Sequence, residues 1–154
     1  MRRTPVRRVK AASLEPDIVP IGTVHTQPGH ESVLDIDSRL VEGLHGIAAG
    51  DHLLVLYWMH GLQSHDRKTL RVHPQGDRSR PLKGVFGLRS PMRPNPIGVS
   101  TVCVTRVERN HVFVSGLDAL DGSPILDIKG RAGRSGRGIG GSHEFIYRDH
   151  HCVR

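Results

Sequence analysis

The chain has 154 residues and a formal net charge of +7 with its 11 histidines neutral. This length suffices for one domain with a hydrophobic core of its own. No apolar run approaches the roughly 20 residues of a membrane-spanning helix, and no signal-peptide core follows the basic N-terminus. The positive charge favours a polyanionic partner, so we expect a cytoplasmic protein that contacts nucleic acid.

The first residues form a separate basic segment. Five of the first ten residues are Arg or Lys, and the first acidic residue is Glu15. The apolar residues are too few and too small for the amphipathic face of a transit peptide. We therefore expect a basic disordered arm over residues 1–16 and a single domain over residues 17–154.

The predicted elements are mostly short strands. Runs of β-branched and aromatic residues alternate with Gly, Pro and Asn turns, which is typical of all-β proteins. In chain order, strands are expected over residues 18–24, 33–36, 52–59, 84–88, 99–107, 112–116, 125–128 and 144–147. Residues 52–59 are the most apolar of these and are expected to be buried on both faces.

The segments between these strands differ in character. Ser38 can cap a short helix over residues 39–44. The polar stretch 61–80 is too long for a simple connection, and we expect it to be either functional or mobile. Residues 89–98 contain three prolines and no regular pattern, and residues 129–142 are rich in Gly and Arg and are expected to be flexible.

This pattern favours one architecture. Short strands joined by tight turns, one short helix and no βαβ spacing indicate an all-β fold, a small antiparallel β-barrel with irregular loops. No G-x-G-x-x-G follows a strand, so a nucleotide-like cofactor would be held without that device. The histidines lack zinc-ligand spacing, and no metal site is predicted.

The proline-rich segment 84–98 is the first candidate site. Proline fixes φ and restricts the preceding residue, so Arg89, Arg93 and Asn95 would be held in place. A guanidinium pairs with the two oxygens of a carboxylate or phosphate. The residues alone are explained equally well by a structural loop across the end of a barrel.

The second candidate segment, residues 117–124, holds Asp118 and Asp121 around an apolar pair. A carboxylate can accept both hydroxyl protons of a ribose. Taken alone, Asp121 and Gly122 are better explained as a turn. His60, at the end of the most apolar strand, is also more often structural than catalytic.

Two sequence blocks resemble the signatures of a known family. Residues 89–91 and 93–100, followed by residues 117–129, resemble those of the YaeB/TsaA-like family. Residues 21–24 and 58–60 occur in the same order, so the resemblance covers roughly residues 18–129. A match this long and ordered is more specific than a lone motif.

The resemblance implies a β-barrel methyltransferase that binds S-adenosylmethionine, usually as a homodimer. The best-known members methylate N6 of threonylcarbamoyl-adenosine in transfer RNA (tRNA). The implied cofactor site comprises Gln27, Pro28, Gly29, His60, Gly61, Arg89, Val99, Asp118, Ala119, Leu120 and Asp121. The implied acceptor-binding residues are Arg93, Asn95 and Lys129, and the candidates for a catalytic base are His60, Asp121 and Lys129.

The chain also departs from the family. Lys129 is followed by Gly130 and Arg131 where the family continues with Pro-Tyr, and the longer bacterial members add a C-terminal domain. Two alternatives therefore stay open: a methyltransferase acting on a small molecule or another RNA, and a non-catalytic RNA-binding barrel. The basic segments 1–10 and 130–141 would either grip RNA phosphates or serve only as solvated tails.

Overall fold

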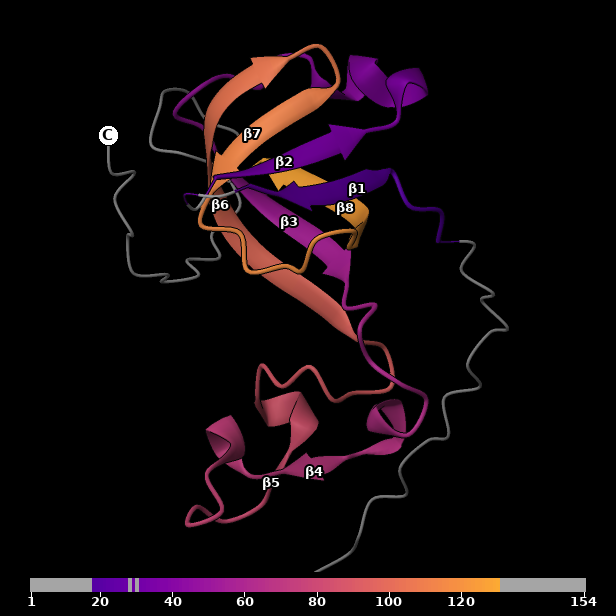
Figure 1. The fold of residues 1–154 in the computed structure, drawn as a ribbon, viewed down its shortest axis with the longest axis vertical. Helices are drawn as coiled ribbons and strands as arrows, with labels where there is room; N and C mark the ends of the chain where they lie inside the picture. The colour runs from indigo at the N-terminus through magenta and orange to yellow at the C-terminus, as the bar shows by residue number, and fades with distance from the viewer. Residues whose placement is uncertain (1–17, 28, 30, 131–154) are drawn as a thin grey trace, which may run out of the picture.

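The structure is a computed structural model and describes residues 18–27, 29 and 31–130. Six antiparallel strands close into a barrel in the order β1-β2-β7-β6-β3-β8 (Figure 1). Their bounds are β1 Gly22–Thr26, β2 Glu31–Ile36, β3 His52–Trp58, β6 Ile97–Glu108, β7 His111–Ser115 and β8 Pro124–Gly130. Strand β8 closes the ring because it pairs with both β1 and β3. The all-β fold expected from the sequence is confirmed.

Some expectations cannot be compared with the structure. The basic arm 1–16, Pro28, the strand over 144–147 and nearly all of the Gly- and Arg-rich segment 129–142 lie outside the described residues.

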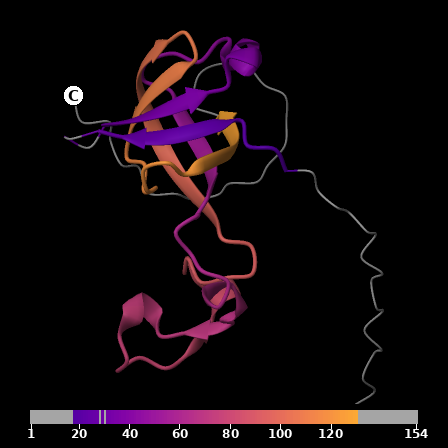
Figure 2. The same ribbon diagram turned by 45° about the vertical axis from the view of Figure 1, so that its right-hand side comes forward.

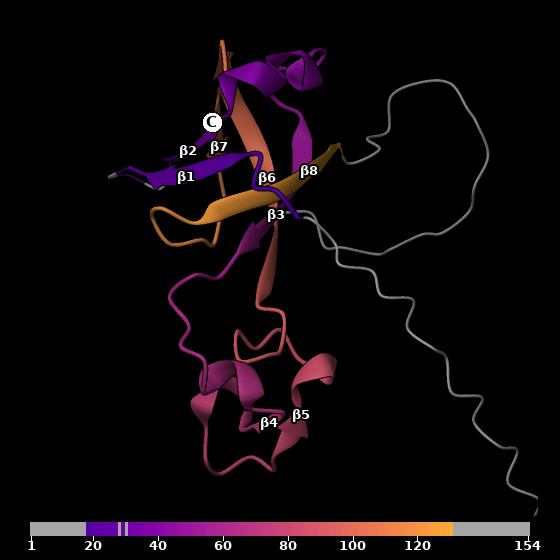
Figure 3. The ribbon, with the colours of Figure 1, turned by 90° about the vertical axis from the view of Figure 1, so that its right-hand side faces the viewer.

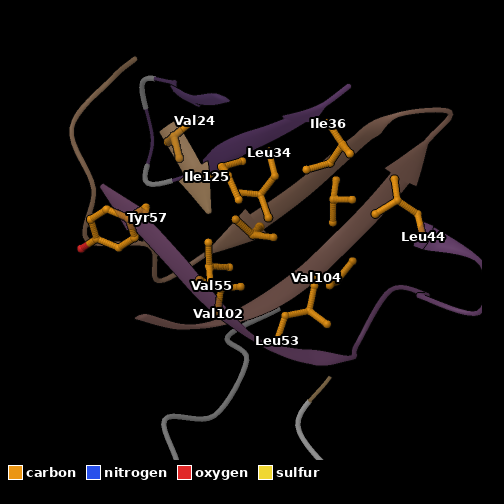
Figure 4. Close-up of a cluster of buried hydrophobic side chains, with 12 residues drawn as sticks. Val24, Leu34, Ile36, Leu44, Leu53, Val55, Tyr57, Val102, Val104 and Ile125 are labelled. Carbon is orange, nitrogen blue, oxygen red and sulfur yellow. The ribbon is translucent and has the colours of Figure 1, made fainter. Parts of the chain in front are cut away.

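Aliphatic side chains fill the barrel (Figure 4). On β3, Leu53, Val55 and Tyr57 point inward while the residues between them are partly exposed, so the expectation of burial on both faces was wrong. This alternation is what a strand with one solvated face produces. Tyr57 lies at one edge of the cluster with its hydroxyl directed away from it. The buried cluster consists of Val24, Leu34, Ile36, Leu44, Leu53, Val55, Tyr57, Val102, Val104, Val112, Val114 and Ile125.

The short helix expected after β2 is a 3-10 helix, η1, over Ser38–Leu44. Its cap is Asp37 rather than Ser38, because the Asp37 carboxylate accepts a hydrogen bond from the Arg39 amide at 2.9 Å. The Arg39 guanidinium also donates to this carboxylate and lowers the pKa of Asp37 to about 2. Leu44 is buried, which anchors the helix to the barrel.

Residues 59–96, hereafter the insertion, project from one end of the barrel (Figures 1 and 2). The insertion joins two paired strands, since Trp58 of β3 lies opposite Ile97 of β6. The Met59 amide donates to the Pro96 carbonyl at 2.8 Å, so its two ends are held together. It contains η2 Asp66–Lys68, β4 Arg71–Val72, η3 Pro74–Gly76, β5 Lys83–Gly84 and η4 Val85–Gly87.

The strand expected over residues 84–88 was wrong. Strand β5 ends at Gly84, and Val85–Gly87 form the 3-10 turn η4. The Val85 amide donates to the Leu70 carbonyl at 3.1 Å, and Val85 is fully buried. Burial of this one side chain turns the chain inward where a strand would have continued.

Candidate functional site

The loop over residues 117–123 is fastened to the end of β1. The Asp121 carboxylate oxygen Oδ1 accepts a hydrogen bond from the Thr26 amide at 2.9 Å, and His25 Nδ1 lies 3.8 Å from the same oxygen. Figure 3 shows this loop on the side of β1 that faces the insertion. The end of β1, which Gln27 follows, is therefore held beside Asp121.

The first residues of the insertion lie against the same loop. His60 Nδ1 is 3.3 Å from the hydroxyl of Ser123, which is buried, while the His60 residue itself is exposed. A Cβ atom placed on Gly61 would lie 3.3 Å from Leu120 Cδ1. The absence of a side chain at Gly61 thus allows Leu120 to approach the chain closely.

Tyr57 connects the loop to β6. Its ring lies against Gly98, where a Cβ atom would come within 2.3 Å of Tyr57 Cζ. The Tyr57 hydroxyl donates to the Asp118 carbonyl, and the Ser100 hydroxyl accepts from the Asp118 amide at 3.4 Å. A tyrosine hydroxyl is protonated at neutral pH, and burial raises the pKa of Tyr57 further above that range. The backbone of Asp118 is fixed and its side chain is left exposed.

Four separate segments therefore meet where the barrel joins the insertion. Most of the residues expected at a cofactor site belong to them: Gln27, His60, Gly61, Val99, Asp118, Ala119, Leu120 and Asp121. Val99 lies between Gly98 and Ser100, which face Tyr57 and the loop, so its exposed side chain is on the other face of β6. Leu120 is 65% exposed, so the site offers apolar surface beside two carboxylates. Such a mixture suits a ligand with a planar apolar part and hydroxyl groups.

Three other expected residues lie in the insertion: Arg89, Arg93 and Asn95. The Arg93 guanidinium donates to the carbonyls of Ser90 at 2.8 Å, Leu88 at 2.7 Å and Val85 at 3.2 Å. In this structure Arg93 holds the backbone around η4, and so positions the neighbouring Arg89.

Lys129 is not brought together with these residues. It lies on β8 opposite Leu54, four residues beyond Ile125, or about 13 Å along the strand. Its Nζ is 2.5 Å from Asp127 Oδ2 and lowers the pKa of Asp127. Within a single chain, the Lys129 side chain therefore lies away from the loop over residues 117–123.

Sequence reasoning missed the residues that support the site: His25, Tyr57, Ser100 and Ser123. The first three lie on strands and Ser123 immediately precedes β8, and their register could not be read from spacing. For Tyr57 the register shows the reason for its role, because it lies opposite Gly98 and its ring covers that glycine.

A separate surface cavity of about 580 Å³ opens between η1 and the β6–β7 hairpin. Val41, Leu44, His45, Val107 and Arg109 are among its lining residues, at the opposite end of β6 from Gly98. None of the expected site residues lines it. Among residues 18–130 that are described, no group of three metal-ligating side chains gathers, and no helix is long and apolar enough to cross a membrane.

Comparisons with known proteins place this arrangement in a class. The chain is 49% identical over 111 residues to a probable S-adenosyl-L-methionine-binding protein of Methanocaldococcus jannaschii, covering 71% of this chain and 87% of that protein. It is 48% identical over 98 residues to an S-adenosyl-L-methionine-binding protein of Archaeoglobus fulgidus, covering 64% of this chain and 67% of that protein. The chain is thus similar in sequence to S-adenosylmethionine-binding proteins.

The family follows from a longer match. Residues 15–132 match the model of the tRNA-methyltransferase O (TrmO) N-terminal domain, and the chain belongs to this family. A crystal structure of TrmO from Pseudomonas aeruginosa superimposes with a TM-score of 0.59 at 26% identity. The alignment covers 79% of this chain and 57% of that protein, so this chain corresponds to little more than half of it.

Proposed function

We propose that this protein is an S-adenosylmethionine-dependent methyltransferase that modifies N6 of threonylcarbamoyl-adenosine in tRNA. The observation that carries the proposal is the meeting of the end of β1, His60 and Gly61, the start of β6 at Gly98 and Ser100, and residues 118–121 at one end of the barrel. The resemblance assigns these same segments to the cofactor. Membership of the family and the names of the relatives support the same reaction class.

The site residues fit the groups of this cofactor. Asp121 uses Oδ1 for the Thr26 amide, so its Oδ2 can accept from ribose hydroxyls. Leu120 offers an apolar contact to an adenine ring. Arg89 supplies a cation for the methionine carboxylate. When bound, the cofactor supplies an activated methyl group, and the protein contributes alignment and charge.

His60 is the best-placed candidate to take the proton of the acceptor nitrogen. When the Ser123 hydroxyl accepts from Nδ1–H, Nε2 keeps its lone pair and can receive that proton. Ser123 is 1% exposed, so its hydroxyl is fixed in position. Asp121 is the second candidate, but its Oδ1 is already bonded to backbone.

The proposal extends to assembly and location. We propose a homodimer that works in the cytoplasm, because the resemblance implies a dimer and tRNA is the expected acceptor. Light scattering at micromolar concentration tests the dimer, and a mass of one chain, 17.0 kDa, would remove it.

The decisive experiment has two steps. Calorimetric titration with S-adenosylmethionine tests the cofactor, and labelled methyl transfer to tRNA with or without the threonylcarbamoyl group tests the acceptor. Transfer only to the modified tRNA supports the full proposal. Cofactor binding without transfer to either tRNA would favour a different acceptor, a rival suggested by the missing Pro-Tyr after Lys129. No cofactor binding at all would leave a non-catalytic RNA-binding barrel.

A further inference from the structure

Charge is divided unequally between the two parts of the described chain. The insertion has eight Lys or Arg residues and only two acidic residues, a net charge of +6. The remaining described residues have four Lys or Arg and nine Asp or Glu, a net charge of −5. The barrel therefore repels a polyanion, and the insertion attracts one.

Part of the positive charge in the insertion is already used inside it. Arg80 pairs with Asp77 at 3.2 Å, and Arg93 binds backbone carbonyls. Arg67 lies over the Trp58 ring at 5.2 Å and donates to the Pro94 carbonyl. Four exposed cations have no carboxylate partner among the residues that the structure describes: Lys68, Arg71, Arg78 and Lys83.

The insertion also presents one aromatic ring to solvent. Phe86 is 79% exposed, although its neighbour Val85 is fully buried. The turn that holds Phe86 is fixed on both sides, because Arg93 bonds the carbonyls of Val85 and Leu88. Phe86 is thus held outward by a braced turn.

We infer that the insertion is the surface that grips single-stranded RNA, with Lys68, Arg71, Arg78 and Lys83 neutralising phosphates and Phe86 stacking on a base. Basic side chains together with an exposed aromatic ring are the usual components of such surfaces. The inference rests on the proposed function for its choice of RNA. It also explains how RNA reaches the site, since His60 and Gly61 near the start of the insertion lie against the loop over residues 117–123.

The salt dependence of RNA binding tests the phosphate contacts. The probe is a fluorescein-labelled anticodon stem-loop containing threonylcarbamoyl-adenosine, titrated by anisotropy at several salt concentrations. Replacing the four cations by Gln should flatten the slope of log affinity against log salt by up to about 2.8 units, at about 0.7 per phosphate. The control is Arg131, Arg134 and Arg137→Ala. A slope that changes in the control and not in the insertion variant would overturn the inference.

Phe86 tests the stacking contact separately. Phe86→Leu keeps an exposed apolar side chain but removes the ring, and should weaken binding about tenfold without altering the salt slope. Phe86→Trp should bind the RNA as tightly as the wild type. Equal affinity of the Leu variant would refute the stacking role.

The outcomes separate this inference from the proposed function. If the insertion variants transfer methyl groups and bind RNA as tightly as the wild type, only the inference about the insertion is wrong. If RNA binding depends on the insertion but no methyl group is transferred, only the proposed reaction is wrong. If neutralising the insertion instead lowers the mass in light scattering and leaves RNA affinity unchanged, the surface docks on the acidic barrel of a second copy, and the inference is wrong.

Discussion

Substitution of Gly98 by Ala should disturb both the barrel and the site. The added Cβ would come within 2.3 Å of Tyr57 Cζ and 2.4 Å of Tyr57 Cε2. The ring has little freedom to move, because Tyr57 is 5% exposed and its hydroxyl bonds the Asp118 carbonyl. Displacing the ring must therefore shift the loop that carries Asp118 and Asp121.

The size of the effect follows from two opposing contributions. Overpacking a filled interior costs roughly 1–3 kcal/mol. Ala also lowers the conformational entropy of the unfolded chain relative to Gly, which stabilises the folded state by about 0.4–1 kcal/mol. The free energy of unfolding should therefore fall by about 1–2 kcal/mol. For a domain of this size that corresponds to a Tm lower by roughly 2–8 °C.

Urea unfolding followed by circular dichroism measures the free energy of unfolding of Gly98→Ala, and calorimetry measures S-adenosylmethionine binding by the same variant. Gly43→Ala is the matched control, because nothing lies within 4 Å of a Cβ atom at Gly43. In a Tyr57→Leu background, Gly98→Ala should cost less than about 0.5 kcal/mol, since its clash is gone. An unfolding free energy equal to that of the wild type, with unchanged cofactor affinity, would refute the packing argument.

Three further predictions concern other positions. Gly22→Ala should lower the free energy of unfolding by about 3 kcal/mol, because the Cβ would lie 2.3 Å from the Asp35 carbonyl oxygen, a backbone atom of β2. Tyr57→Phe should remove part of the alkaline loss of stability in urea titrations: burial raises the pKa of Tyr57, so the unfolded chain ionises first once the pH exceeds about 10. Asp121→Asn and Arg89→Ala should each weaken S-adenosylmethionine binding about tenfold, or about 1.4 kcal/mol, in calorimetry.

Each of these has its own control. Gly22→Ala is compared with Gly43→Ala, and equal stability of the two variants would argue against tight pairing of β1 with β2. The stability difference between the wild type and Tyr57→Phe should be constant below pH 9, where it reflects the lost hydrogen bond, and should move in favour of the Phe variant above pH 10. A difference that stays constant at every pH would contradict the raised pKa of Tyr57. Asp127→Asn, on β8, should leave cofactor affinity unchanged, and wild-type affinity in both site variants would place the pocket elsewhere.

The strands were predictable because their signals are local. β-branched runs marked β2, β3, β6, β7 and β8 to within a few residues, and the strands expected over residues 99–107 and 112–116 left residues 108–111 for the turn between them. Arg109 indeed adopts a positive φ of 55° there. Closure of the ring was also expected, since many short strands without crossover helices leave few other ways to remove exposed edges.

The insertion was not predictable in the same way. Its strands β4 and β5 have two residues each, too short for any periodicity, and its order depends on single contacts such as Val85 to Leu70. Within the site, likewise, some residues could be identified from a motif, but their contacts could not. Asp121 was identified from its motif, but its bond to the Thr26 amide joins residues 95 positions apart, which no local pattern reveals. Likewise, the sequence did not indicate that Arg93 would bind backbone carbonyls.

The pairing of Trp58 with Ile97 has a consequence for how this fold can change. The Met59 amide and the Pro96 carbonyl bring the two ends of the insertion together. The 38 residues between Trp58 and Ile97 therefore connect β3 to β6 with the same end-to-end geometry as a tight hairpin turn. The entropy of closing a loop rises only slowly with its length, by about 0.6 kcal/mol for each doubling. Segments of very different length and charge could therefore occupy this position without reopening the ring. The barrel can stay constant while the segment at its rim is exchanged, so acceptor preference and fold can evolve independently.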